Sequence, residues 1–177
     1  MLEEKTVKSN LIFKGRVCNL IVEDVVLPSG EFSKREIVEI KDSVGIIAYT
    51  VDKKVLLIKQ FRKPVNEVLY EIPAGCIDYG EDKLTAAKRE LLEETGYGEG
   101  EFTLINNFFP SPGTNRQTHS IYLAKNVIKL SESLNLDSDE FLELVEVSFE
   151  EFEQLYKSGK LTDLKTSYAF LTLKSIL

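Results

Sequence analysis

Glycines, glutamates and one arginine recur at fixed spacing between residues 75 and 97, and this segment constrains the fold more than any other. It reads GCIDYGEDKLTAAKRELLEETGY and follows the pattern G-x5-E-x7-R-E-U-x-E-E-x-G, where U is apolar. The residues at the fixed positions are Gly75, Glu81, Arg89, Glu90, Leu91, Glu93, Glu94 and Gly96. Because average residue usage makes a chance match very rare, the pattern indicates one particular local structure.

The spacing predicts a helix with two different faces, because each helical residue advances by about 100° around the axis. One predicted sector is apolar and contains Leu84, Ala87, Leu91 and Leu92. A neighbouring sector carries the carboxylates of Glu90, Glu93 and Glu94. Ala86 is predicted to lie among these carboxylates, where its small side chain would leave room for an ion or a phosphate.

The acidic sector needs a compensating partner, because like charges at i and i+4 destabilise a bare helix by a few tenths of a kcal/mol. A hard divalent cation is one such partner, since carboxylate oxygens suit Mg²⁺ or Mn²⁺. A solvated acidic face is the alternative, and it is the usual explanation of a charge run. The flanking glycines favour the metal site. Gly75 would let the backbone approach a ligand closely, and Gly96 fits the left-handed residue that ends a helix.

Composition excludes several classes of protein. A chain of 177 residues with 43% hydrophobic content can bury a core in one main domain. A net charge of −7 argues against nucleic-acid or acidic-membrane binding, so an anionic substrate would be met by metal and a few arginines. With His119 as the single histidine, the chemistry has to run on carboxylates. The N-terminus does not read as a signal peptide, no apolar run spans a bilayer and the two cysteines form no disulfide framework, so we expect a cytoplasmic location.

Hydrophobic patterning predicts the remaining elements. Alternating and β-branched residues indicate an N-terminal antiparallel unit with strands at 11–27 and 35–41 around the turn Pro28-Ser29-Gly30. Further strands are predicted at 44–51, 55–61, 102–109, 118–127 and 142–148, and helices at 150–158 and 162–176. We therefore expect an α/β fold with a β-strand unit over residues 1–43 and a catalytic domain over residues 44–177.

The pattern at 75–96 resembles the signature of the Nudix hydrolases. Three further segments resemble the ADP-ribose pyrophosphatase branch of that family: Gln60-Phe61-Arg62, Leu69 to Gly75 and Phe109 to Gly113. The resemblance covers nearly the whole chain and implies an α/β/α sandwich around a mixed β-sheet. It also implies metal-dependent hydrolysis of the pyrophosphate bond of ADP-ribose to AMP and ribose 5-phosphate. Tyr97 departs from the usual aliphatic residue, which alters packing but no ligand.

The resemblance implies a set of metal ligands. Glu90 and Glu94 would bind Mg²⁺, with Mn²⁺ as the alternative, together with the backbone carbonyl of Ala74. Glu93 would be a further ligand or a support. In the family the arginine orients a glutamate, although Arg89 could instead pair only with Glu93 one turn on.

Glu93, Glu94 and Glu140 are the catalytic candidates. Members of the resembled branch often carry, in a loop near residue 140, a glutamate that activates the attacking water or helps to hold a metal. Glu140 matches this residue best, and Asp139 is the second choice. Without the resemblance, the acidic run at 137–140 would be interpreted as a solvated loop.

Five substrate-binding candidates lie outside the helix, and each has a structural alternative. The guanidinium fork of Arg62 suits a pyrophosphate, but Arg62 could be a surface cation. Glu71 would face the metal helix or be an ordinary exposed strand residue. Pro112 and Gly113 would lie against the terminal ribose or only break a loop. Arg35 would reach the partner subunit's site or lie on a solvated strand edge.

The resemblance also implies a homodimer, in which strands of residues 1–43 exchange between subunits and line the nucleotide site. Phe13 or Phe32 would stack on adenine there, unless both are core residues. The expected partner is a small-molecule nucleoside diphosphate sugar, with no nucleic acid and no membrane. Two rival interpretations remain: a pyrophosphatase for another nucleoside diphosphate sugar such as GDP-mannose, and a module that senses ADP-ribose without hydrolysing it.

Overall fold

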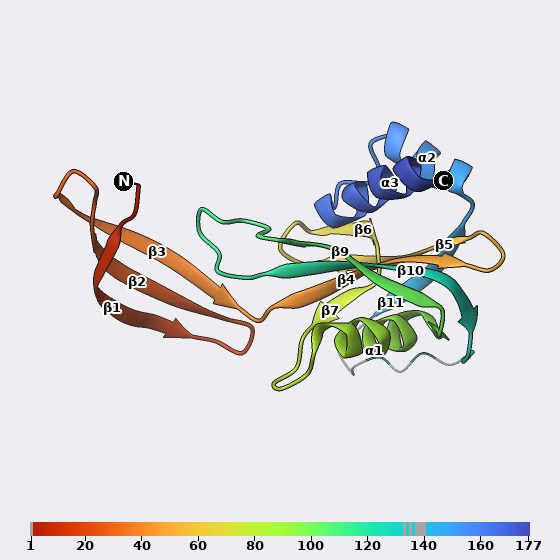
Figure 1. Ribbon diagram of the computed structural model, residues 1–177, viewed down its shortest axis with the longest axis horizontal. Helices are drawn as coiled ribbons and strands as arrows, with labels where there is room; N and C mark the ends of the chain where they lie inside the picture. Colours follow the sequence, from red (N-terminus) through yellow and green to blue (C-terminus); the bar gives the residue numbers. More distant parts are fainter. Residues whose placement is uncertain (1, 133, 135, 137–140) are drawn as a thin grey trace. The chain divides into compact units, whose positions relative to one another are not determined.

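The chain forms two compact units in the computed structural model, which describes residues 2–132, 134, 136 and 141–177 (Figure 1). The first unit contains Met1–Ser43 and Asn107–His119, and the second contains Val44–Asn106 and Ser120–Leu177. A division at residue 43 was expected from the sequence. The contacts add the segment 107–119 to the N-terminal part, although it was expected in the catalytic domain.

The first unit is built on an antiparallel sheet in the order β1-β2-β3. Its strands are β1 (Lys5–Lys14), β2 (Cys18–Val26) and β3 (Phe32–Ile40). The turn predicted at Pro28-Ser29-Gly30 is present, and Gly30 has a φ of 90°. The prediction of one strand over 11–27 was wrong, because the chain reverses between β1 and β2. Gly15 allows this turn, since a Cβ there would lie 2.7 Å from the Cys18 carbonyl oxygen.

The segment 107–119 joins the first unit through backbone hydrogen bonds to β3. The Val38 N–H donates to the Thr114 carbonyl at 2.7 Å, and the Arg116 N–H donates to the Val38 carbonyl at 3.0 Å. The Arg116 side chain also pairs with Glu23 on β2 at 2.9 Å. The loop that contains Pro112 and Gly113 is therefore fastened, at its C-terminal end, to the N-terminal sheet.

The second unit contains, within the described residues, an eight-stranded sheet whose main path is β11-β5-β4-β10-β8. Strand β6 pairs with β5, β7 with β4, and β9 with β10. The strands are β4 (Ser43–Thr50), β5 (Val55–Arg62), β6 (Glu67–Glu71), β7 (Ala74–Cys76), β8 (Tyr97–Gly98), β9 (Glu101–Phe108), β10 (His119–Lys129) and β11 (Leu142–Val147). Strands β4, β5, β9, β10 and β11 lie within a few residues of the predicted strands, whereas β6, β7 and β8 were not predicted.

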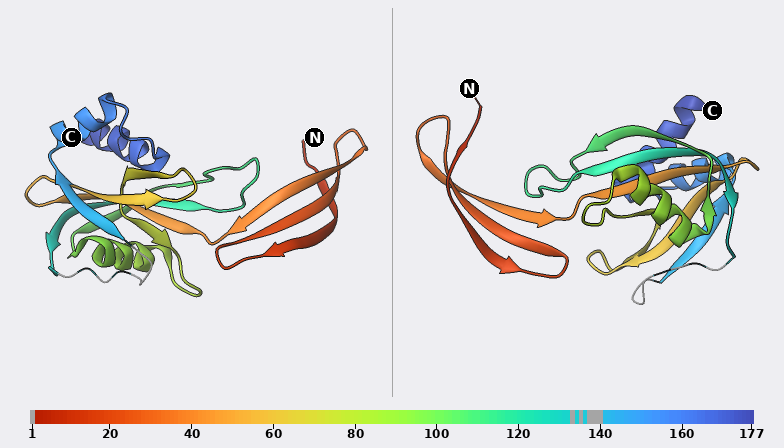
Figure 2. Two further views of the ribbon diagram at one scale, coloured as in Figure 1. Left: turned by 180° about the vertical axis from the view of Figure 1, so that it is seen from behind. Right: turned by 60° about the horizontal axis from the view of Figure 1, so that its bottom comes forward.

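Three described helices cover the sheet of the second unit: α1 (Lys83–Thr95), α2 (Phe149–Lys157) and α3 (Leu164–Ile176). Figure 1 shows α1 on one face of this sheet and α2 and α3 on the other, and the views in Figure 2 agree. The second unit is therefore the α/β/α sandwich expected from the sequence. Among the described residues, no helix is long and apolar enough to cross a membrane.

Helix α1 begins and ends at residues that satisfy its free backbone groups. The Asp82 carboxylate accepts hydrogen bonds from the Leu84 and Thr85 N–H groups at 3.0 and 3.1 Å. Gly96 has a φ of 72°, and its N–H donates to the Leu92 carbonyl at 2.9 Å. A Cβ at Gly96 would lie 2.2 Å from the Ser131 carbonyl oxygen. The prediction of a glycine C-cap is confirmed.

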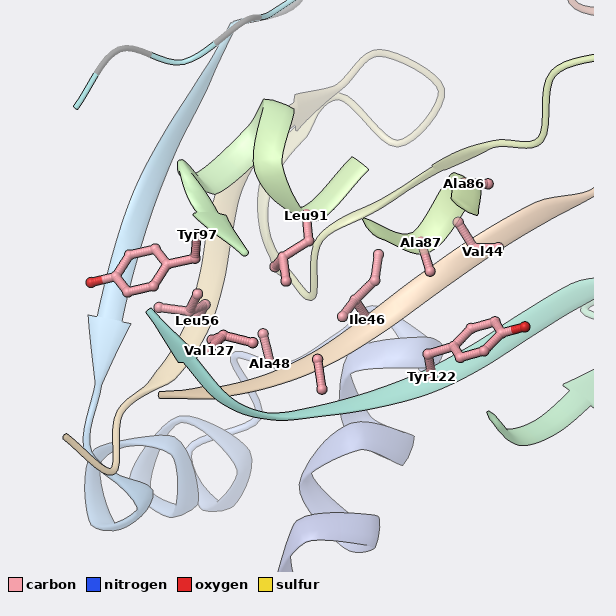
Figure 3. Packing of buried hydrophobic residues seen from close by; sticks show 11 residues of the cluster. Val44, Ile46, Ala48, Leu56, Ala86, Ala87, Leu91, Tyr97, Tyr122 and Val127 are labelled. Carbon is pink, nitrogen blue, oxygen red and sulfur yellow. The ribbon is translucent and has the colours of Figure 1, made fainter. Parts of the chain in front are cut away.

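The buried residues between α1 and the sheet show which side of the helix faces the sheet (Figure 3). Its buried residues are Val44, Ile46, Ala48, Leu56, Ala86, Ala87, Leu91, Tyr97, Tyr122, Ala124 and Val127. Leu84 and Leu92 are 37% and 40% exposed, whereas Ala86 is fully buried. The prediction that Ala86 leaves room for an ion was therefore wrong, because Ala86 packs in this core. The same rotation brings Glu94 onto the buried side of the helix.

The opposite face of the sheet carries an aromatic cluster from α2 and α3. Phe152 and Phe170 meet edge to face with ring centroids 5.5 Å apart, and Tyr156 stacks on Phe170 at 4.4 Å. Ser148 and Glu151 form a reciprocal capping box at the start of α2. Asp163 caps α3 by accepting a hydrogen bond from the Thr166 N–H at 3.0 Å. This cap fixes the first turn of α3, which reaches the candidate site.

Candidate active site

Arg89 lies in the middle of α1 and is the centre of a hydrogen-bonded network. Its Nε and Nη2 donate to the two carboxylate oxygens of Glu81 at 2.9 and 2.8 Å. Its Nη1 donates to Glu90 at 2.8 Å and to Glu93 at 3.0 Å, and Nη2 also donates to the Cys76 carbonyl at 3.0 Å. Arg89 therefore does more than pair with Glu93, since it joins Glu81, Glu90, Glu93 and the end of β7. We call these residues the Arg89 network.

The charges within the Arg89 network stabilise one another. The hydrogen bonds from Arg89, and then the backbone hydrogen bond from Asp78, lower the pKa of Glu81 to about 2. The hydrogen bond to Glu81, and then those to Glu90 and Glu93, raise the pKa of Arg89 despite the opposing effect of burial. One guanidinium thus offsets part of the repulsion among the carboxylates of Glu81, Glu90 and Glu93.

Gly75 leaves space for the carboxylate of Glu90. A Cβ added at Gly75 would lie 2.0 Å from the Cδ atom of Glu90 and 2.1 Å from its nearer oxygen. Any side chain at this position would therefore displace the carboxylate. The sequence predicted a close approach of the backbone to a ligand, and the structure shows a close approach to a glutamate of the predicted metal site.

Glu94 is held against the same strand on the buried side of α1. Glu94 is 3% exposed, and its Oε2 accepts a hydrogen bond from the Ala74 N–H at 2.9 Å. A buried carboxylate is costly unless it is hydrogen-bonded or coordinates a metal, so this placement needs a strong reason. Glu90 and Glu94 therefore meet the consecutive residues Gly75 and Ala74 of β7.

Arg62 and Glu71 form a second charged group with two residues of the α3 N-terminus. The Arg62 Nε and Nη2 donate to the two oxygens of Glu71 at 2.6 and 2.8 Å. The Lys165 ammonium donates to Oε2 of Glu71 and pairs with Asp163 at 3.1 Å. We call Arg62, Glu71, Asp163 and Lys165 the Glu71 cluster.

Burial is the main difference between Glu71 and an ordinary strand residue. Glu71 is 1% exposed, so its interpretation as an exposed strand residue was wrong. Burial raises the pKa of Glu71, but the Arg62 hydrogen bonds and the Lys165 charge outweigh it and leave the pKa below its usual value. The hydrogen bond to Glu71 is also the main cause that raises the pKa of Arg62, which makes Arg62 more than a surface cation.

Sequence reasoning missed Lys165 and Thr166. The Thr166 hydroxyl donates to Asp163 at 2.6 Å and accepts the Ile72 N–H at 2.8 Å. The contact with Ile72 crosses 94 positions of the chain, and the sequence offers only the local signal of an aspartate cap three residues before Thr166. The first turn of α3 therefore supports the segment that leads from Glu71 to Ala74.

The remaining predicted residues lie in the first unit or outside the described residues. Arg35 is partly exposed and forms a bidentate pair with Glu4 at 2.9 and 2.6 Å. Pro112 and Gly113 are exposed in the loop of the first unit. Glu140 and Asp139 lie outside the described residues. The interpretation of Phe13 and Phe32 as core residues was wrong, because they are 57% and 77% exposed.

The donor set on α1 suits a hard divalent cation, because carboxylate and carbonyl oxygens are the ligands that such ions prefer. In the part of the chain that the structure describes, no three His, Cys, Asp or Glu side chains converge as a metal-binding group. Glu90 and Glu93 instead contact Arg89, and Glu94 contacts the Ala74 N–H. A cation held by Glu90 and Glu93 would therefore replace Arg89 as their partner, and one held by Glu94 would add to the Ala74 N–H.

Comparison with known proteins identifies the class to which this fold and site belong. A family model of the NUDIX domain matches residues 39–169. The chain therefore belongs to the NUDIX family. Nudix hydrolases generally use a divalent metal ion, which agrees with the oxygen donors on α1.

Two curated relatives match the chain over most of its length. The chain is 44% identical over 178 residues to the ADP-ribose pyrophosphatase of Bacillus subtilis (strain 168), covering 99% of this chain and 96% of the relative. It is 42% identical over 169 residues to the methanol dehydrogenase activator of Bacillus methanolicus, covering 96% and 91%. A crystal structure of an ADP compounds hydrolase superposes with a TM-score of 0.85 over 100% of this chain and 96% of that chain. At 21% identity, that similarity concerns the fold alone.

Proposed function

We propose that this chain is a metal-dependent hydrolase that cleaves the pyrophosphate bond of ADP-ribose and releases AMP and ribose 5-phosphate. The observation that carries the proposal is the placement of Glu90 and Glu94 against Gly75 and Ala74. This arrangement brings two carboxylates of α1 to one short stretch of backbone. The 44% identical ADP-ribose pyrophosphatase supports the choice of substrate.

Glu90 and Glu94 would hold Mg²⁺, or alternatively Mn²⁺, with the carbonyl of Ala74, and Glu93 would be a further ligand or a support. A bound divalent ion would neutralise phosphate charge and lower the pKa of the attacking water. Arg89 keeps Glu90 and Glu93 oriented in the free protein through its Nη1. Glu93, Glu94 and Glu140 remain the candidates for the general base, and each would accept the proton of that water.

Arg62 is the proposed phosphate-binding group of the second unit. Its bonds to Glu71 use Nε and Nη2, so the Nη1 edge is the one that would meet a phosphate oxygen. A charge-assisted bond of this kind, held in place before the substrate arrives, favours binding of the phosphate that is not attacked. Glu71 would then act on the substrate by holding Arg62.

We further propose a homodimer whose N-terminal strands contribute to the nucleotide site, with Arg35, Pro112 and Gly113 as substrate contacts. Exposed apolar side chains on the first unit support an interface between copies. Val7, Leu11, Phe13 and Phe32 are 61%, 55%, 57% and 77% exposed. If light scattering shows a monomer and that monomer is active, Arg35 has no cross-subunit role. The cytoplasmic location stays a prediction.

The test is a substrate panel with phosphatase-coupled release of phosphate in the presence of Mg²⁺. It compares ADP-ribose, ADP-glucose, GDP-mannose, NADH and diadenosine polyphosphates. We expect kcat/KM to be highest for ADP-ribose. A higher value for GDP-mannose would keep the mechanism but replace the substrate. Binding of ADP-ribose without any hydrolysis would support the sensing module instead.

A further inference from the structure

Lys165 occupies a position that the stability of α3 does not explain. It is the second residue of α3, directly after the N-terminal residue Leu164, and its side chain is 17% exposed. A positive charge at a helix N-terminus is opposed by the helix dipole, and burial adds a desolvation cost. The ion pairs with Glu71 and Asp163 offset these costs. Lys165 therefore stabilises the buried charge of Glu71 and does not stabilise the N-terminus of α3.

The Glu71 cluster is connected to the proposed metal site through a short stretch of backbone. Glu71 ends β6, and three residues later the Ala74 N–H donates to Glu94 at 2.9 Å. Between them, the Ile72 N–H is fixed to the Thr166 hydroxyl at 2.8 Å. The charge of Glu94 also contributes to the raised pKa of Arg62, which means that the two groups are within electrostatic reach of each other. Lys165 is thus coupled to Arg62 through Glu71 and is linked, through the backbone of residues 71–74, to the proposed metal ligand Glu94.

The charges of the Glu71 cluster explain why a second cation is needed. Glu71 is buried, so a single guanidinium would be its sole compensating charge and would be held tightly by it. Lys165 shares Oε2 of Glu71 with Arg62 Nη2. With two cations and two carboxylates the cluster is neutral, and a phosphate can then compete for part of the Arg62 charge. Without Lys165, the cluster would carry a net negative charge that repels phosphate.

We propose that Lys165 is a positioning residue for the pyrophosphate, because it neutralises and orients Glu71 and thereby presents the Nη1 edge of Arg62 to a substrate phosphate. The inference rests on the proposed ADP-ribose hydrolysis and adds a residue to it. Because this role concerns binding of a phosphate that is not attacked, Lys165 affects the ground state and the transition state alike. Its loss therefore changes KM much more than kcat.

The experiment compares steady-state kinetics of Lys165→Met, Lys165→Arg and Lys174→Met with the wild type. We expect Lys165→Met to raise KM for ADP-ribose about tenfold with kcat changed by less than about twofold, and Lys165→Arg to restore most of the KM. Lys174→Met is the matched control, since it removes an ion pair of the same helix, with Glu153 at 2.9 Å, away from the Glu71 cluster. An unchanged KM in Lys165→Met, or the same rise in Lys174→Met, would overturn the proposal.

A double-mutant cycle tests whether Lys165 acts through Glu71. In a Glu71→Gln background, Lys165→Met is expected to change KM by less than about twofold, because the carboxylate that it neutralises is gone. A full tenfold effect in that background would contradict the proposed route. This cycle can also be measured if Lys165→Met alone folds poorly. The double variant has no carboxylate at residue 71, so it leaves no unpaired buried charge there.

Failure of the proposed function is distinguishable from failure of this inference. A wild type that does not hydrolyse ADP-ribose refutes the proposed function. The same variants are then compared by calorimetric binding of ADP-ribose, where Lys165→Met is expected to raise Kd about tenfold. A wild type that is active, together with an unaffected Lys165→Met, refutes only the role of Lys165.

Discussion

The Arg89 network and the Glu71 cluster are both built from carboxylates around a guanidinium, but they are assembled in different ways. In the Arg89 network all the partners lie within 13 positions of Arg89. In the Glu71 cluster, Lys165 reaches Glu71 across 94 positions. Both arginine side chains are partly exposed, 28% for Arg89 and 41% for Arg62, but the Glu71 side chain is 2% exposed, whereas the glutamates of the Arg89 network are 12% to 30% exposed. The first group is therefore local and partly exposed, and the second is long-range and built around a buried carboxylate.

This contrast suggests that the two charged groups have different roles in the reaction. Partly exposed ion pairs contribute less to stability than buried ones, so the Arg89 network could release Glu90 and Glu93 to the proposed metal ion at a smaller cost. Breaking a buried pair leaves a charge without compensation, so the Glu71 cluster is expected to stay intact during the reaction. We infer that the first group changes partners during the catalytic cycle and that the second is a fixed support.

Glu71→Ala gives the largest expected effect on stability. Removing this buried carboxylate leaves Arg62 without its carboxylate partner and Lys165 with Asp163 alone, which costs about 3 kcal/mol of unfolding free energy. Glu81→Ala is the matched change in the Arg89 network and should cost about 1 kcal/mol or less, because Arg89 keeps Glu90 and Glu93. Urea unfolding at pH 7 measures both. Equal losses would remove the distinction between a fixed and an exchangeable group.

Gly75→Ala is expected to affect activity more than stability. The new Cβ would overlap the Glu90 carboxylate, 2.0 Å from its Cδ, and displace a proposed metal ligand. We expect kcat to fall roughly 100-fold, which corresponds to about 2.7 kcal/mol of transition-state stabilisation. Thermal unfolding checks that the variant is folded. Full activity would mean that the position of Glu90 in the free protein is irrelevant to the reaction.

The pH dependence of stability tests the Arg89 network separately. The pKa of Glu81 is lowered from 4.5 to about 2, so its ion pair stabilises the fold above pH 4.5. This contribution is lost as the pH falls from 4.5 towards 2, because protonation then removes the charge that Arg89 binds. Unfolding free energies of the wild type and Glu81→Gln should converge over this window. Parallel curves would show that the pair is broken in solution.

Tyr97→Phe is the smallest change and examines a long-range contact outside both groups. The Tyr97 hydroxyl donates to Glu146 at 2.6 Å, and burial followed by this hydrogen bond raises the pKa of Tyr97. Loss of one such bond costs about 1 kcal/mol and leaves the ring in the core. Kinetic constants should not change. A large loss of activity would indicate that β8 and β11 act on the site.

The sequence predicted what depends on neighbouring residues and missed what depends on distant ones. The Gly96 C-cap of α1 and the longer strands of the second unit followed from local patterns, and so did the proximity of Arg89 and Glu93, whereas the Asp82 N-cap and the short strands β6, β7 and β8 were not predicted. The rotation of α1 on the sheet did not, because burial of Ala86 and exposure of Leu92 depend on the strands beneath. The turn at Gly15 was missed because it carries no proline to mark it. Lys165 was missed because no local pattern indicates a contact with β6.

Glu94→Gln tests the central claim most directly. Glutamine keeps an oxygen that can accept the Ala74 N–H but removes the charge that would bind a divalent ion, so the fold should be preserved. The measurement is the turnover of ADP-ribose by wild type and variant at saturating Mg²⁺. We predict a loss of roughly 1,000-fold in kcat, on the scale of a lost electrostatic contribution to the transition state. Near wild-type turnover would contradict the assignment of Glu94 and of the carboxylate site on α1.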